Sequence, residues 1–199
     1  MVRSPAAVVT RVLGEGFAGD GRLAAGHGTR MVAGRFAVPA GQGLCVCDVL
    51  ADVHAPEVEA DLAAGDYVVH VVGGSVPAVA VAVHENATID ELVWEDALTS
   101  EKVPVGVSVD AGVIGFGTVA AVRALQADTD LVEAVIDSST TDDFGTLVTT
   151  TPHGHVVSLT AGYGDGVYPL FVGRDSTGTA TAVAVDFGTA RTIGNILYR

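Results

Sequence analysis

Short apolar runs, rich in valine and often alternating with small or polar residues, make up most of the chain from residue 34 onward. β-Branched side chains favour pleated strands because their restricted χ1 angle costs little there. Glycine, proline, asparagine or aspartate separates the runs at short intervals, which is typical of turns between strands. The pattern predicts strands at Gly34–Val38, Leu44–Val49, Asp66–Val72, Ala78–His84, Gly106–Asp110, Gly145–Thr151, Val156–Ala161, Tyr168–Arg174 and Thr179–Phe187.

Helical patterns are fewer and lie in the second half of the chain. Residues 118–127 are rich in alanine, and their larger apolar side chains recur at helical spacing. Thr129 and Asp130 can cap a second helix that continues through Ile136, and the polar stretch 137–143 predicts an exposed loop. We therefore expect a mainly β fold, a single-domain β-sandwich or rolled sheet with one or two short helices inserted before the last strands.

Composition supports one folded domain. The chain has 199 residues, of which 49% are hydrophobic, which is enough to bury a core and excludes intrinsic disorder. We expect residues 26–199 to form a single β-rich domain, with a loose N-terminal segment at 1–25. No apolar run approaches the roughly 20 residues that cross a bilayer, and the first residues lack a secretory pattern, so the predicted location is cytoplasmic.

Charge narrows the range of partners. Twenty-four Asp and Glu residues against 10 Lys and Arg give a formal net charge of −14, which would repel a nucleic-acid backbone. A similar acidity also arises from the compositional bias of GC-rich or salt-adapted bacteria. We expect a protein or small-molecule partner and neither nucleic acid nor membrane, and exposed β edges favour a homo-oligomer.

Two aspartates stand in glycine-rich turns. Residues 161–178 hold the densest glycine cluster, and the glycines around Asp165 permit positive φ and a tight turn. Asp110 occupies a similar position, at the end of a strand that runs into a glycine turn. Each carboxylate can serve either to hold its turn or to bind a ligand, and the sequence leaves both readings open.

These motifs carry a family resemblance. VDAGVIGF at 109–116, AGYGDGVYPLFVGRDSTG at 161–178 and VDF at 185–187 follow three further segments, GLCVCDVL at 43–50, GDYVV at 65–69 and ELVWEDA at 91–97. In this order they resemble the bacterial family called Domain of Unknown Function 4241, over roughly Arg35 to Phe187. The resemblance implies a compact, mainly β domain, but it supplies no reaction, substrate or catalytic residue.

A small enzyme is one hypothesis. Aspartates that converge at one end of the sheet would shift each other's pKa and, with a histidine base, allow acid–base or metal-assisted hydrolysis or elimination. The candidate catalytic residues are Asp110, Asp165 and His155, with His153, Asp175 and Asp186 as further members.

Metal binding is a second hypothesis. Residues two apart in a strand share a face, so Cys45, Cys47, His153 and His155 could form a tetrahedral zinc site if their strands were adjacent. The cysteines can equally be small core hydrophobes or a reactive thiol. Asp-Gly loops also suit calcium, so we expect either no cofactor or a divalent cation, and a calcium-stabilised structural domain is a further alternative.

A binding module is the preferred hypothesis, because the sequence contains no nucleophile elbow and no phosphate-binding loop. An acidic β domain would complement a basic partner, as a neutralising partner of a bacterial toxin does, or bind a small ligand through its loops. The candidate ligand-binding residues are Tyr163, Tyr168, Arg174 and Asp175.

Overall fold

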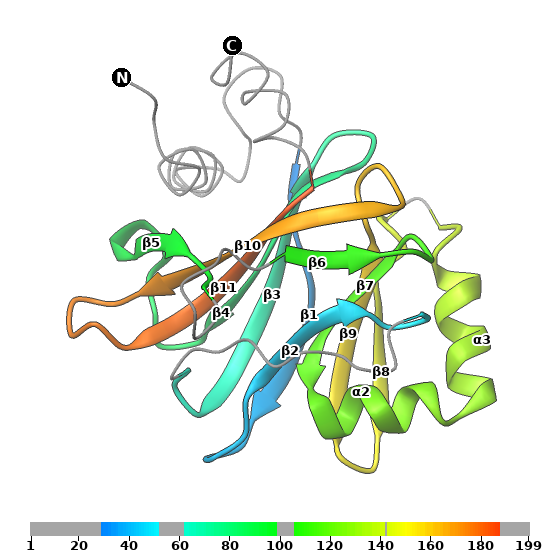
Figure 1. Cartoon of the computed structure of the whole chain (residues 1–199), viewed down its shortest axis with the longest axis horizontal. Coiled ribbons are helices and arrows are strands. Elements are labelled where there is room, and N and C mark those ends of the chain that lie inside the picture. The colour runs from blue at the N-terminus through cyan, green and yellow to red at the C-terminus, as the bar shows by residue number, and fades with distance from the viewer. Residues whose placement is uncertain (1–28, 52–61, 99–105, 142, 188–199) are drawn as a thin grey trace.

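The computed structural model describes residues 29–51, 62–98, 106–141 and 143–187. Their strands form two antiparallel sheets that pack face to face without closing into a barrel (Figure 1). The larger sheet has the order β1 (Thr29–Val38), β3 (Gly65–Gly73), β4 (Pro77–His84), β11 (Ala180–Asp186), β10 (Gly166–Arg174) and β5 (Val93–Asp96). The smaller sheet has the order β2 (Leu44–Asp48), β7 (Val113–Thr118), β9 (Gly154–Thr160) and β8 (Leu147–Thr151).

Strand β10 has two partners along the same edge. Its C-terminal half pairs with β5, and its N-terminal half pairs with β6 (Gly106–Val109). β6 in turn approaches β2 of the smaller sheet, so the two sheets meet at this corner (Figure 1). We call the two ends of this strand the Gly166 end and the Arg174 end.

The main core lies between the two sheets. Phe36, Tyr67 and Leu170 of the larger sheet pack against Phe116 and Leu159 of the smaller one, and all five are almost fully buried. Phe36 and Tyr67 stack with ring centroids 5.6 Å apart. The mainly β sandwich predicted from the valine-rich runs is confirmed.

Two helices follow β7 and cover the other face of the smaller sheet (Figure 1). They are α2 (Val119–Gln126), capped by the Thr118 hydroxyl, and α3 (Thr129–Ser138), capped by the Asp128 carboxylate. Both were predicted, and they precede the last strands as expected. Asp128 takes the capping role proposed for the next two residues because its side chain reaches the first free N–H groups of α3.

The outer face of the larger sheet carries its own apolar cluster. Val81, Trp94 and Phe171 are buried there, and the connection from β4 to β5 packs against it through Leu92. That connection contains a short 3-10 helix, η1 (Ile89–Glu91). The larger sheet is therefore apolar on both faces, as its nearly continuous valine and alanine runs require.

Two strands were not predicted. β7 contains Gly115 and Gly117, which resemble turn residues in the sequence. In the fold they allow close packing, because a Cβ at Gly115 would collide with Val49 and one at Gly117 would crowd Val156. β5 has only four residues, too few for a clear alternation. No described helix has the length and apolar character of a membrane span, and the predicted loose segment 1–25 lies outside the described residues.

Candidate functional site

A buried aspartate organises the Gly166 end. Asp48 ends β2 with only 1% of its surface exposed. Its Oδ1 accepts hydrogen bonds from Leu50 N (2.9 Å) and Ala51 N (3.1 Å), and its Oδ2 accepts from Asp110 N (2.8 Å) and Ala111 N (2.7 Å). Four backbone N–H groups thus compensate for burying this carboxylate. Asp48 holds the turn after β6 against the end of β2.

The two glycine-rich turns lie side by side at this end. Val109 of β6 pairs with Gly166 of β10, so the register brings Asp110 next to Asp165, and both aspartates are exposed. The backbone N–H of Ala161 donates to the carbonyl of Gly112 at 2.8 Å, which joins the turns directly. Gly112 has φ of 71° and approaches Gly164, whose φ is 85°. The turns need glycine at both positions, since positive φ strains other residues.

The tyrosines of the second turn have different environments. Tyr168 is buried, and its hydroxyl donates to the carbonyl of Gly164 at 2.7 Å while its ring packs edge-on against Phe187. Tyr163 is 75% exposed, and Val167 nearby is 73% exposed. Of the two tyrosines proposed to bind a ligand, Tyr168 therefore supports the turn from within, and Tyr163 presents its ring on the surface.

The candidate base His155 lies apart from the two candidate aspartates. His155 lies near the start of β9, six residues from Ala161, which contacts the Asp110 turn, so about 20 Å of extended strand separates them. The His155 ring instead contacts the Thr150 hydroxyl at 3.2 Å, and His153 is exposed in the adjacent turn. Asp175 lies at the Arg174 end, about 30 Å along β10 from Asp165. Of the two further aspartates proposed, Asp175 and Asp186, the buried Asp186 is the one that lies toward the Gly166 end.

The four residues of the proposed zinc site lie in different environments. Cys45 and Cys47 share a face as predicted, but that face is fully buried beneath α2 and α3 among Val122, Leu125 and Val135. Both are thiols that form no disulfide. His153 and His155 are exposed in the β8–β9 hairpin, and no three His, Cys, Asp or Glu side chains of the described ranges are grouped to hold a metal ion. The cysteines act as small core residues.

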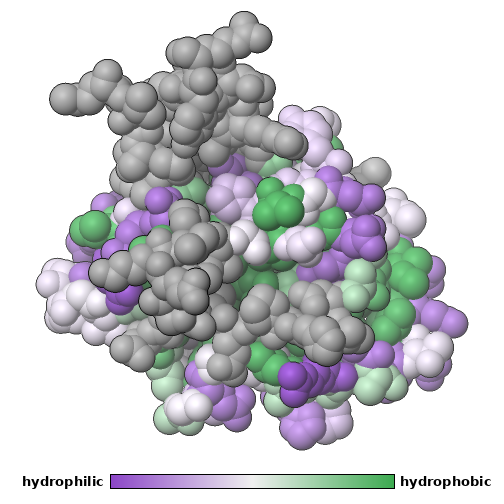
Figure 2. Space-filling view, viewed as in Figure 1, coloured by the Kyte–Doolittle hydropathy of each residue, from purple (hydrophilic) through white to green (hydrophobic). Residues whose placement is uncertain are grey.

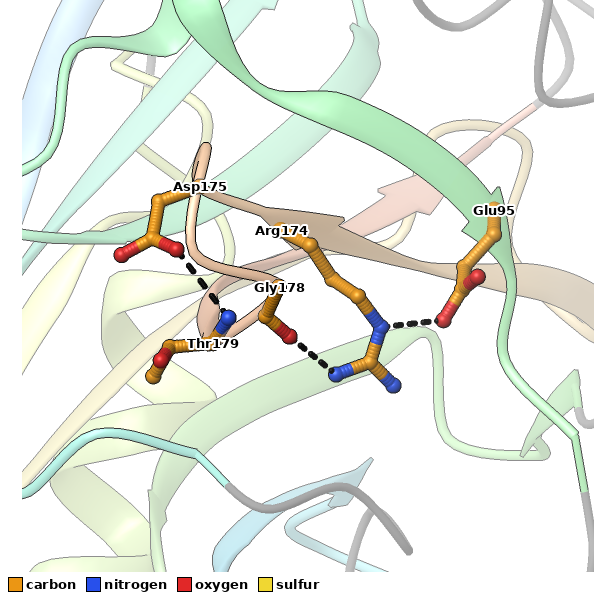
Figure 3. A network of polar contacts seen from close by, with 5 residues as sticks. All are labelled: Glu95, Arg174, Asp175, Gly178 and Thr179. Carbon is orange, nitrogen blue, oxygen red and sulfur yellow. Dashed lines mark hydrogen bonds and ion pairs between the residues drawn. The ribbon is translucent and has the colours of Figure 1, made fainter.

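The Arg174 end is a hairpin stabilised by local polar contacts (Figure 3). The Arg174 Nε donates to Glu95 Oε1 at 2.6 Å, and its Nη1 donates to the carbonyl of Gly178 at 3.1 Å. Asp175 Oδ1 accepts from the backbone N–H groups of Thr177 and Thr179. The hydrogen bond from the Thr177 hydroxyl lowers the pKa of Asp175, so the carboxylate is charged near neutral pH.

Two cavities flank the β4–β5 connection, and the sequence pattern did not indicate them. One has a volume of about 390 Å³ and lies between this connection and the β10–β11 hairpin, with Glu91, Asp175 and Thr181 among its lining residues. The other, of about 300 Å³, is lined by side chains that include Arg30, His70 and Asp90. His84 lines both.

Arg30 and His70 form the polar centre of the smaller cavity. Arg30 Nε donates to His70 Nδ1 at 3.3 Å. Burial, followed by the positive charges of Arg30 and Arg35, lowers the pKa of His70 to about 4, so its ring is neutral at pH 7. Burial also lowers the pKa of Arg30, an effect that Asp90 opposes. No motif marked these residues, because the pair joins positions 40 apart in the chain.

The family assignment follows from the same elements. A family model described as "Protein of unknown function (DUF4241)" matches residues 36–185, from β1 to β11. The chain belongs to this family. The DUF4241 match covers Asp48 and both glycine-rich turns, and it confirms the resemblance inferred from their motifs. No curated protein and no solved structure matches the chain.

Proposed function

We propose that this DUF4241 domain is a binding module whose Gly166 end docks onto a basic surface of another protein. The observation that supports this most directly is the apposition of the Asp110 and Asp165 turns, each of which carries an exposed aspartate. The Tyr163 ring, 75% exposed, and the Val167 side chain, 73% exposed, supply apolar contact area next to them. We call these four residues the docking surface.

Buried side chains hold the two turns of the docking surface in place through hydrogen bonds. Asp48 fixes the first turn through two bonds to its backbone, and the Tyr168 hydroxyl fixes the second turn. A rigid surface loses little conformational entropy when it binds, and tyrosine offers a large contact area with few rotatable bonds. These features suit a surface that recognises a partner.

Charge points to the nature of the partner. The chain carries a formal charge of −14, which attracts a lysine- or arginine-rich surface and speeds the encounter. On the face shown in Figure 2, hydrophobic residues lie in small groups between hydrophilic ones. A basic toxin neutralised by this domain would fit the proposal, as would any partner with the same surface chemistry.

The test compares matched variants in affinity capture from native lysate at low and moderate salt. One bait carries Asp110→Asn and Asp165→Asn, a second carries Tyr163→Ser, and the control carries Glu133→Gln and Asp137→Asn on α3, which removes the same two charges elsewhere. A genuine partner is retained in stoichiometric amount by wild type and control and lost by both docking-surface baits. Calorimetry with the purified partner should show an affinity that falls as the salt concentration rises.

Two outcomes contradict the proposal. One is that no protein distinguishes the docking-surface baits from the control at either salt concentration. The other is that the purified partner binds the docking-surface variants as tightly as it binds wild type.

A further inference from the structure

The larger cavity has the character of a small-molecule site separate from the docking surface. Its volume of about 390 Å³ falls within the range of ligand pockets and far exceeds the space of a single ion. The β4–β5 connection forms one wall with Thr88 and Glu91, and the β10–β11 hairpin forms the other with Asp175 and Thr179. Leu92 adds apolar surface between them.

A buried hydroxyl provides independent support for a ligand. Thr181 lines this cavity and is 94% buried, since only 6% of its surface is exposed. Its Oγ1 has no hydrogen-bond partner. It stands where the β10–β11 register shifts: Gly173 pairs with Ala182 and Arg174 with Ala180, so Thr181 is the extra residue of a β-bulge. An unsatisfied buried hydroxyl is costly, and a bound polar group would relieve that cost.

The charges of the lining select the ligand class. Glu91 and Asp175 contribute two carboxylates, and none of the described residues lining this cavity is a lysine or arginine. The His84 ring also lines this cavity, and its Nδ1 accepts a hydrogen bond from the backbone N–H of Asn86. An anionic ligand would be repelled here, whereas an ammonium group would be attracted to both walls.

Asp175 is fixed in a suitable position. Its Oδ1 already accepts bonds from the hairpin backbone, which sets the direction of the second carboxylate oxygen. Arg174 braces the same hairpin against β5 through Glu95 (Figure 3). A site with one preformed wall needs little rearrangement to bind.

We propose that this cavity binds a small organic ammonium compound that also carries hydroxyl groups, such as an amino sugar or an amino alcohol. The ammonium group would lie between Glu91 and Asp175, and a ligand hydroxyl would pair with Thr181. The threonine hydroxyls at 88 and 179 offer further partners for a polyhydroxylated ligand.

The first experiment measures binding of glucosamine and ethanolamine by calorimetry and by the shift in melting temperature. Glucose serves as the neutral counterpart of glucosamine, and glucuronate serves as the anionic one. We expect saturable binding and a raised melting temperature with the two amines only, below the pKa of their amino groups. Absence of saturable binding by both amines, or equal binding of glucose, overturns the proposal.

The second experiment places the ligand in this cavity. Glu91→Gln and Asp175→Asn should each weaken amine binding by about tenfold, the usual scale for losing one charge-assisted hydrogen bond. Asp90→Asn is the control, because it removes the same charge from the same 3-10 helix but lines the smaller cavity. If Asp90→Asn weakens binding as much as Glu91→Gln, the amine responds to the general negative potential and the assigned site is wrong.

Thr181→Val separates a ligand contact from a structural role. Valine has nearly the same shape, so the variant removes an unsatisfied buried hydroxyl and should raise the melting temperature of the ligand-free protein. The same variant should bind glucosamine less tightly than wild type does. A variant with a raised melting temperature and unchanged glucosamine affinity would exclude Thr181 from the site.

Discussion

The two ends of β10 hold acidic side chains in opposite ways. At the Gly166 end, Asp48 is buried and binds the backbone of a turn 62 residues away, which couples β2 to β6. At the Arg174 end, the hydrogen bonds to Asp175 come from its own hairpin, from the backbone of Thr177 and Thr179 and from the Thr177 hydroxyl. The first carboxylate holds the sandwich together, and the second shapes a surface loop. Long-range anchoring should therefore govern stability, and local anchoring should govern amine binding in the larger cavity.

Asp48→Ala should cause the largest loss of stability. It deletes the acceptor of four backbone N–H groups, and each polar group left buried without a partner costs about 1–3 kcal/mol. We expect the free energy of unfolding to fall by about 3–5 kcal/mol in urea denaturation. Asp175→Ala should cost clearly less, because its donors can bond to water instead. Equal losses for the two variants would refute the contrast between the ends.

The second largest expected effect is a loss of stability at acidic pH caused by His70, which lines the smaller cavity beside the β4–β5 connection. Its pKa in the folded protein is about 4, below the 6.5 of an unfolded histidine, so between these values protons bind the unfolded chain preferentially. Stability should be fully present above about pH 6.5 and decline toward pH 4. Because solvent screens this half-buried group, we expect the decline to be about 1–2 kcal/mol.

The control for this pH dependence is His70→Gln, which keeps a hydrogen-bonding side chain beside Arg30 and removes the titration. The difference in unfolding free energy between wild type and variant, measured from neutral to acidic pH, isolates the histidine from the many carboxylates. Parallel pH profiles would mean that His70 titrates normally in the folded protein.

Local patterns predicted the strands better than they predicted the contacts between turns. The runs around Val68, Val81 and Val183 alternate or remain apolar over whole strands, and their predicted bounds lie within a few residues of β3, β4 and β11. β7 escaped prediction because its glycines serve packing against Val49 and not turning. Periodicity indicates which residues form a strand, but it does not indicate where a neighbouring side chain packs so closely that the strand needs a glycine.

The candidate site was predictable only in part. Asp110 and Asp165 were singled out from their glycine turns, and the register pairs Val109 and Gly166, the residues next to them in the chain. That Asp48 anchors the first turn could not be foreseen, because nothing local specifies which distant N–H groups a carboxylate reaches. The larger cavity could not be predicted for the same reason, since its walls come from the β4–β5 connection and the β10–β11 hairpin, which meet only in the folded chain.

Two buried tyrosines, one toward each end, make the same hydrogen bond, and removing either hydroxyl should cause a smaller loss of stability. Tyr168 at the Gly166 end and Tyr67 near the Arg174 end each donate a hydroxyl to the carbonyl four residues earlier, both at 2.7 Å. Burial raises the pKa of Tyr67 to about 12, so its hydroxyl stays protonated as a donor. Replacing either by phenylalanine should cost about 1 kcal/mol in urea denaturation.

The two tyrosine variants should differ in binding. If the Tyr168 hydroxyl keeps the docking surface rigid, Tyr168→Phe should weaken partner binding, whereas Tyr67→Phe should leave it unchanged. Equal effects of both variants on partner affinity would show that general stability, and not the shape of the second turn, controls recognition.

The smallest expected effect belongs to the ion pair at the Arg174 end. Arg174 and Glu95 are 33% and 52% exposed, and exposed pairs contribute little because water screens them and ordering two long side chains costs entropy. Glu95→Gln should lower the free energy of unfolding by about 0.5 kcal/mol or less, and high salt should erase the difference.

Arg174→Lys is the more informative variant of this pair, because lysine keeps the charge but cannot bond Glu95 and the Gly178 carbonyl at the same time. If Arg174 mainly braces the hairpin, Arg174→Lys should weaken amine binding in the larger cavity with little change in stability, a combination that a purely electrostatic surface pair would not produce.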